Sequence, residues 1–183
     1  MRYIRYFFIY RKNEVRAQLL AAKAGVILAF ETMETDFLNT VEKAMVWVRA
    51  LDSPYLQLYP DAGNLTNAAR LYGTDELADL ALGRGHLAAL HLKETRPGVY
   101  REVPYGTGHV DFAGMTRTAW QLGVRRYLAE FWDDGREDWA ELLAENNRFL
   151  RRYLDAAAGA ERGHAAGKHN IYEGGGETPC WKN

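Results

Sequence analysis

Four short apolar runs, separated by stretches with helical periodicity, constrain the fold of this chain more than any other feature. The runs cover residues 25–30, 55–59, 86–90 and 126–129. They are nearly continuous rather than alternating, which is typical of strands covered on both faces of a parallel sheet. The sequence therefore predicts an α/β fold in which right-handed crossovers join parallel strands.

The segments around these runs have the spacing and capping residues of helices. We expect helices over residues 13–24, 40–51, 75–82, 111–122 and 139–157, which gives one helix followed by four βα units. This pattern fits three architectures equally well. They are a free-standing four-stranded sheet, an open doubly wound fold and half of a (β/α)₈ barrel.

Composition narrows the partners and the compartment. A chain of 183 residues with 48% hydrophobic and 26% charged residues can bury one sizeable core. The net charge of -1 provides no overall attraction to nucleic acid or to an anionic membrane, so we expect neither as a partner. No run approaches the roughly 18 apolar residues of a membrane span, and residues 6–10 are too short for a signal-peptide core. The single cysteine, Cys180, excludes a disulfide framework and favours a cytoplasmic location.

One ionisable side chain directly follows each predicted strand. These residues are Glu31, Asp61, His91 and Glu130, and they are each about one βα unit apart. A single acid in this position is usually a helix cap or a solvated loop residue, but four in succession would converge at the carboxyl ends of barrel strands. Three carboxylates gathered there would repel one another unless a cation lay between them. We therefore expect a divalent metal ion, with Mn²⁺ or Mg²⁺ suited to the oxygen ligands and Zn²⁺ or Co²⁺ admitted by the histidine.

Five segments around these residues resemble, in order, the L-ribulose-5-phosphate (L-xylulose-5-phosphate) 3-epimerase family of xylose-isomerase-like TIM barrels. The segments are LAFETME, SPYLQLYPDAGNL, GHLAALHLKETRPGVY, VPYGTGHVDF and YLAEFW. The resemblance extends over about residues 15–154 and implies a partial (β/α)₈ barrel, its C-terminal half. It also implies that Glu31, Asp61, His91 and Glu130 are the metal ligands.

The resemblance implies a reaction as well. The expected function is inversion of C3 of a ketopentose phosphate, from L-ribulose 5-phosphate to L-xylulose 5-phosphate, through a metal-stabilised enediolate. Glu31 and Glu130 follow the first and fourth strands, so they can flank a planar intermediate. One would remove the C3 proton and the other would supply it to the opposite face.

The phosphate of such a substrate needs its own site. Backbone N–H groups at Gly106 and Gly108 precede a predicted helix and are expected to bind it, as in other barrels. Lys93 or Arg96 would add positive charge. An ordinary loop with a helix start is the alternative interpretation, and the resembling family usually has Glu where Thr107 stands.

Two further residues are candidates for contacts to the sugar. Asn64 is expected to hydrogen-bond a substrate hydroxyl, although a turn residue in DAGN has an equally good structural explanation. Trp132 is expected to cover one side of the sugar, with core packing as the alternative. His86 is expected to be a packed or capping histidine rather than a substrate contact.

Members of the resembling family carry four βα units ahead of the stretch matched here, and residues 1–10 do not replace them. We therefore expect a truncated barrel with three parts. Residues 1–24 form an N-terminal segment and helix, residues 25–157 form the half barrel with the metal site, and residues 158–183 form a disordered tail. The outer strands would expose unpaired edges, so self-association is expected.

Three other functions remain open at this point. The chain could be a non-catalytic remnant, which the sequence does not distinguish from an active epimerase because all four ligands are present. A related hexulose-phosphate isomerase would have the same signature. A metal-dependent endonuclease is less favoured, because it would need more His and Asp ligands and a basic groove.

Overall fold

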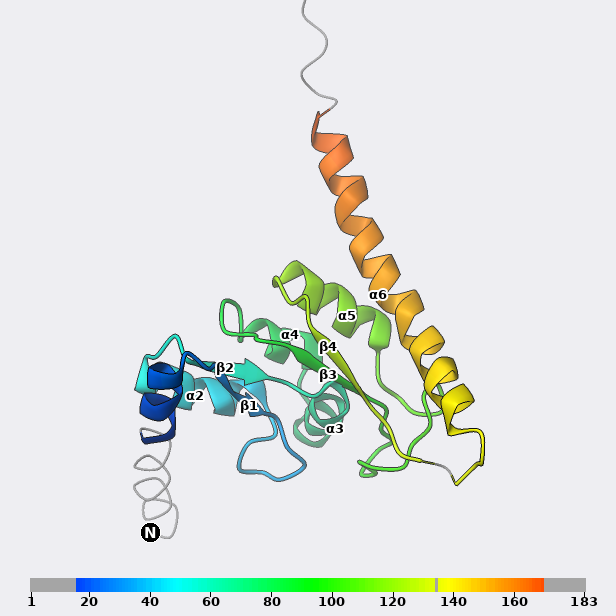
Figure 1. The fold of residues 1–183 in the computed structure, drawn as a ribbon, viewed down its shortest axis with the longest axis horizontal. Helices are drawn as coiled ribbons and strands as arrows, with labels where there is room; N and C mark the ends of the chain where they lie inside the picture. The colour runs from blue at the N-terminus through cyan, green and yellow to red at the C-terminus, as the bar shows by residue number, and fades with distance from the viewer. Residues whose placement is uncertain (1–15, 134, 170–183) are drawn as a thin grey trace, which may run out of the picture.

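The computed structural model describes residues 16–133 and 135–169 of the chain, with side chains described as far as residue 160. This part contains four short parallel strands separated by helices, as the sequence predicts (Figure 1). The strands are β1 (Leu28–Glu31), β2 (Leu56–Tyr59), β3 (Leu90–Lys93) and β4 (Tyr127–Glu130). The α/β class with parallel strands is therefore confirmed.

The strands follow one another in sequence order across one parallel layer. β1 pairs with β2 from Leu28↔Leu56 to Glu31↔Tyr59, and β3 pairs with β4 from Leu90↔Tyr127 to Lys93↔Glu130. Isolated parallel bridges Leu58↔Leu87 and Asp61↔His91 join the two pairs. Within the described residues, β1 and β4 each have one neighbouring strand, so the layer has two open edges.

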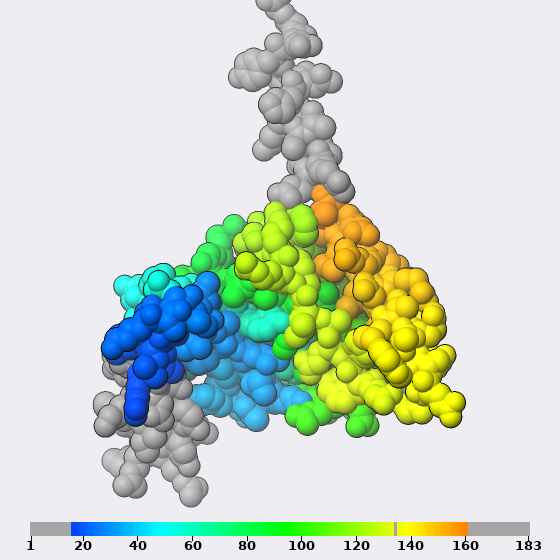
Figure 2. All heavy atoms as spheres, in the orientation of Figure 1, coloured from blue at the N-terminus to red at the C-terminus, as the bar shows by residue number. Residues whose placement is uncertain are grey.

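Helices connect consecutive strands, and a short helix over residues 16–24 precedes β1. The others are α2 (Val41–Leu51), α3 (Ala62–Tyr72), α4 (Glu76–Ala81), α5 (Phe112–Gln121) and α6 (Trp139–His169). Figure 2 shows the residues of α6, in yellow to orange, along one flank of the molecule beside those of α5. Asp61, Asp75 and Asp111 cap α3, α4 and α5 with their carboxylates, which accept the first free N–H groups of each helix.

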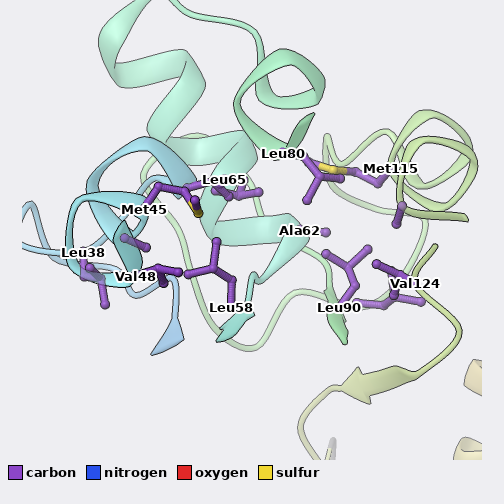
Figure 3. Packing of buried hydrophobic residues seen from close by; sticks show 14 of the residues in the cluster. Leu38, Met45, Val48, Leu58, Ala62, Leu65, Leu80, Leu90, Met115 and Val124 are labelled. Carbon is purple, nitrogen blue, oxygen red and sulfur yellow. The ribbon is translucent and has the colours of Figure 1, made fainter. Parts of the chain in front are cut away.

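The hydrophobic core lies between the strands and the helices that cover one face of the layer. Figure 3 shows Leu58 of β2 facing Met45 and Val48 of α2, and Leu90 of β3 beside Val124. All five side chains are at most 3% exposed. Because successive side chains of a strand alternate between faces, residues adjacent to these leucines point to the opposite, concave side of the layer.

The predicted start and end of the third strand are both wrong. The third strand was expected at residues 86–90, but β3 begins at Leu90 and ends at Lys93. Its polar residues His91 and Lys93 face the concave side, so β3 is not a continuous apolar run.

Helix α3 was not predicted from the sequence. Its segment AGNLTNAARLY is rich in small and polar residues, although the whole first half of the helix is buried.

The last helix is longer than predicted. α6 continues to His169 instead of ending at residue 157, so residues 158–169 are helical where disorder was expected. The remaining residues of the expected tail, 170–183, and the aromatic segment 1–10 lie outside the described residues. The outer ends of the layer expose apolar side chains, with Val26 51%, Ile27 56% and Leu128 50% exposed.

No helix in the described part of the chain combines the length and apolar character of a membrane span. The cytoplasmic location expected from the cysteine content stays a prediction.

Candidate metal centre

The four residues predicted to bind a metal ion lie together on the concave side of the strands. Glu31, Asp61, His91 and Glu130 each offer one ligand atom, and these atoms lie within 4.8 Å of one another. Nδ1 of His91 is 2.7 Å from a Glu31 carboxylate oxygen, 3.5 Å from one of Glu130 and 4.0 Å from one of Asp61.

The convergence depends on the curvature of the layer. Glu31 ends β1 and Glu130 ends β4. In a flat sheet three strand spacings, roughly 14 Å, would separate them. Their ligand atoms are nevertheless within 4.8 Å, so the layer curves around the point where they meet. This is the geometry of a barrel wall, whose catalytic side chains gather at the carboxyl ends of the strands.

Asp61 is held rigidly at the base of this cluster. It is completely buried, and it lies just after the end of β2 as the N-cap of α3. Its Oδ1 accepts the N–H of Asn64 at 2.7 Å, and its own N–H donates to the hydroxyl of Thr32 at 2.9 Å. Asn64 completes the link, because its side-chain amide donates to the carbonyl oxygen of Thr32 at 2.7 Å. These bonds tie the end of β1 to the start of α3.

The electrostatics of the cluster oppose three ionised carboxylates. Burial raises the pKa of Asp61 to about 7; the negative charges of Glu130 and Glu31 add to this, while Lys93 acts against it. Burial, followed by the charges of the same three carboxylates, also raises the pKa of Tyr59. The Tyr59 ring lies 4.1 Å from the His91 ring between centroids. A cation among the carboxylates would relieve this repulsion.

The side chains present fit a divalent ion. Oδ2 of Asp61 and Nε2 of His91 are buried and have no hydrogen-bond partner within the described chain. Oδ2 of Asp61 faces Nδ1 of His91, where the other two carboxylates also meet. Three carboxylates with one imidazole are suitable ligands for Mn²⁺, Mg²⁺, Zn²⁺ or Co²⁺. The orphaned oxygen at the point of convergence is the feature that such an ion would satisfy.

Lys93, predicted as a phosphate contact, lies within the cluster itself. Its side chain is only 3% exposed. Nζ is 3.6 Å from Oδ1 of Asp61 and 3.5 Å from Oε1 of Glu130. The spacing of two residues from His91 on one strand was the available signal that both side chains share a face.

The loop predicted to bind phosphate already contacts a carboxylate. Glu94 is 2% exposed, and its oxygens accept the N–H groups of Thr95, Gly106 and Val110 at 3.1, 3.0 and 3.1 Å. Gly108 packs tightly beside Glu94 and Thr95, because an added Cβ would be 2.4 Å from Oε1 of Glu94 and 2.1 Å from the Thr95 carbonyl oxygen. Glu94, which was not predicted from the sequence, takes the place of an external anion at this loop. Phosphate binding by Gly106 and Gly108 stays a prediction.

The remaining predicted contacts lie at different depths. Asn64 is 2% exposed and engaged with Thr32, whereas Trp132 is half-buried. Trp132 lines a cavity of about 290 Å³ together with Tyr105 and Phe131. Arg96 lies on the surface, where its guanidinium donates to the carbonyl and the hydroxyl of Thr107.

A larger cavity, of about 470 Å³, lies between β4 and α6 and is lined by Tyr127, Ala129, Leu150 and Leu154 among others. None of the four clustered residues lines it. We assign the candidate metal site to the cluster rather than to the larger cavity, because among the described residues it is at the cluster that at least three possible metal ligands converge. The Glu31 and Glu130 side chains are 35% and 31% exposed, so a ligand can reach them from the open concave side.

Tyr105 supports the cluster from behind and was also missed. Its hydroxyl contacts the carbonyl oxygens of Leu92 and Glu130, the latter at 3.1 Å. Its ring stacks on Phe149 with centroids 5.4 Å apart. Tyr105 therefore fastens the end of β3 to the end of β4 beside Glu130.

Comparisons with known proteins identify relatives of this chain. The L-ribulose-5-phosphate 3-epimerase UlaE of Escherichia coli is 36% identical over 143 residues, which cover 78% of this chain and 49% of the relative. The corresponding protein of Escherichia fergusonii matches equally well. The chain thus spans about half the length of the curated relatives it matches.

Solved structures share the fold at lower identity. An L-ribulose 3-epimerase superimposes with a TM-score of 0.62 at 17% identity, covering 90% of this chain and 58% of that one. A D-tagatose 3-epimerase-like protein gives 0.67 at 14% identity, with coverage of 82% and 55%.

The model of one protein family, described as the xylose isomerase-like TIM barrel, matches residues 14–153. This range includes all four strands and all four clustered side chains. The chain therefore belongs to the xylose isomerase-like TIM barrel family.

Proposed function

We propose that the chain carries the metal centre of a sugar-phosphate epimerase that inverts C3 of L-ribulose 5-phosphate to give L-xylulose 5-phosphate. The observation that carries this proposal is the convergence of Glu31, Asp61, His91 and Glu130, with the orphaned Oδ2 of Asp61 at its centre. The identity to curated L-ribulose-5-phosphate 3-epimerases supports the choice of substrate.

The four side chains divide into two pairs by exposure. Asp61 and His91 are buried and would hold a divalent ion, with Glu31 and Glu130 as further ligands. When bound, the ion would supply Lewis acidity to the C2 carbonyl and C3 hydroxyl oxygens and stabilise the enediolate charge.

Glu31 and Glu130 are the proposed acid and base. They reach the cluster from the two outer strands, so their carboxylates approach it from opposite sides. One takes the proton from C3, and the other returns a proton to the opposite face of the planar intermediate. Trp132 stays the proposed cover for the sugar, whereas the contacts of Asn64 favour a role in holding Asp61.

Hydrogen exchange at C3 tests the proposal directly. Protein loaded with Mn²⁺ is incubated with L-ribulose 5-phosphate in D₂O, and deuterium at C3 is followed by NMR. We expect exchange by the natural chain and its loss in Glu31→Gln and Glu130→Gln. Glu34→Gln is the matched control, because Glu34 lies three residues after Glu31 but pairs with Arg101 outside the cluster.

A metal-bound sample that leaves C3 unlabelled would overturn the epimerase proposal and support the non-catalytic alternative. Exchange with hexulose phosphates but not with the pentulose phosphate would instead support the related isomerase. The two substrates are therefore tested side by side in the same experiment.

We also propose that the open edges of β1 and β4 associate with a second copy of the chain. A two-fold axis through the centre of curvature would place β4 of each copy beside β1 of the other, which gives eight parallel strands. Both clusters would then face one interior, so bound metal should favour the pairing by neutralising carboxylates. Sedimentation velocity with Mn²⁺ and with EDTA tests this, and a monomer under both conditions would exclude it.

A further inference from the structure

Lys93 contacts the cluster in a specific way. Asp61 turns Oδ2 toward Nδ1 of His91 and Oδ1 toward Nζ of Lys93. Glu130 does the same, with Oε2 toward His91 and Oε1 toward Lys93. Each carboxylate therefore has one oxygen at the point where an ion would bind and the other at the ammonium group. Lys93 and an ion can hold both residues at once without competing for an oxygen.

The charge of the centre depends on this ammonium group. Glu31, Asp61 and Glu130 contribute three negative charges when they are ionised, and a divalent ion cancels two of them. Lys93 is 3% exposed, so water screens its charge only weakly. Because an uncompensated buried charge is unfavourable, the centre is balanced only when both cations are present.

We propose that Lys93 is a second cation of the metal centre, which holds Asp61 and Glu130 by the oxygens that the ion does not use and makes the site loaded with a divalent ion electrically neutral. This inference rests on the proposed metal centre but not on any sugar substrate. Lys93 would therefore contact two metal-binding carboxylates rather than a substrate phosphate. Lys93 is a positioning residue for Glu130 and sets the ionic charge that the site prefers.

Ion selectivity measures this charge balance. Ca²⁺ and Tb³⁺ have similar radii and differ in charge, so the ratio of their affinities reports the net charge of the site. Losing one positive charge favours the trivalent ion more, because the Coulomb energy is proportional to the ion's charge. In Lys93→Met we expect the ratio of Tb³⁺ to Ca²⁺ affinity to rise by at least about tenfold, because the lost charge lies against two of the carboxylates that would bind the ion.

The experiment compares the natural chain with three variants by Tb³⁺ luminescence and Ca²⁺ competition. Lys93→Arg keeps the charge, so its ratio should stay within about threefold of the natural one. Lys43→Met removes a lysine on α2 that lies over the Tyr72 ring, away from the cluster, and should leave the ratio unchanged. Lys93→Gln replaces Lys93→Met if the latter does not fold.

The outcomes separate this inference from the proposed function. An unchanged ratio in a folded Lys93→Met that still binds ions would overturn the charge-balance role while leaving the metal centre intact. Loss of binding of both ions by the folded variant would likewise overturn it. If the natural chain binds neither ion, the proposed metal centre fails and this inference fails with it. Absence of epimerase activity in a chain that binds ions has no bearing on Lys93.

Discussion

Replacing Asp61 with Asn should stabilise the metal-free protein at pH 8 and remove its stabilisation by metal ions. The carboxylate is completely buried, and burial raises its pKa from 3.8 to about 7. Asn has the same shape, and its Oδ1 can still accept the N–H of Asn64. The substitution therefore removes the charge and keeps the helix cap.

The magnitude follows from the two pKa values. As pH rises from 4 to 7 the unfolded chain releases this proton while the folded chain retains it, so stability falls across this range and is constant above it. Each unit of difference between the folded and unfolded pKa of Asp61 corresponds to about 1.4 kcal/mol, so the folded protein loses about 4 kcal/mol of stability above pH 7. Asp61→Asn should therefore raise the free energy of unfolding by about 4 kcal/mol at pH 8 and by roughly half as much at pH 5.

Urea denaturation in EDTA at pH 5 and pH 8 measures this difference, and repeating it with Mn²⁺ measures the linked loss of binding. Asp111→Asn is the matched control, because Asp111 caps α5 through the same i+3 contact but is exposed. Asn and Asp are equally good caps, so this control should change stability by less than about 0.5 kcal/mol. If Asp61→Asn is less stable than the natural chain in EDTA at pH 8, the argument from burial is wrong.

Three further substitutions test the supports of the centre. Gly108→Ala should cost about 1–3 kcal/mol of unfolding free energy, because its Cβ would lie 2.1 Å from the Thr95 carbonyl oxygen. Its control is Gly159→Ala in α6, whose Cβ would meet nothing within 4 Å and which should stabilise the protein by about 0.5–1 kcal/mol. Equal effects of the two substitutions would contradict the steric argument for Gly108. Glu94→Ala should cost more than about 3 kcal/mol, because three backbone N–H groups lose their acceptor, and limited proteolysis should then cut between residues 95 and 110. Tyr105→Phe should cost about 1 kcal/mol and weaken Mn²⁺ binding in calorimetry, whereas unchanged binding would show that its hydroxyl does not position Glu130.

Local sequence patterns were sufficient to predict most of the fold and the four residues of the cluster. Short apolar runs between capped helices predicted the parallel layer, because strands covered by helices need apolar side chains on their buried face. Glu31, Asp61, His91 and Glu130 could be grouped in advance because each lies near the end of a predicted strand, and parallel strands end at the same edge. The interval of about one βα unit between them is a property of the sequence alone.

The tertiary structure decided the environment of these side chains. Burial of Asp61, the placement of Lys93 against two carboxylates and the capture of the Gly106 loop by Glu94 all depend on residues far apart in the chain. The buried helix α3 escaped prediction for the same reason, since its small and polar residues pack against β3 and the loop after it. A residue's type and spacing determine what it can bind, whereas its charge and contacts depend on neighbours that only folding brings within reach.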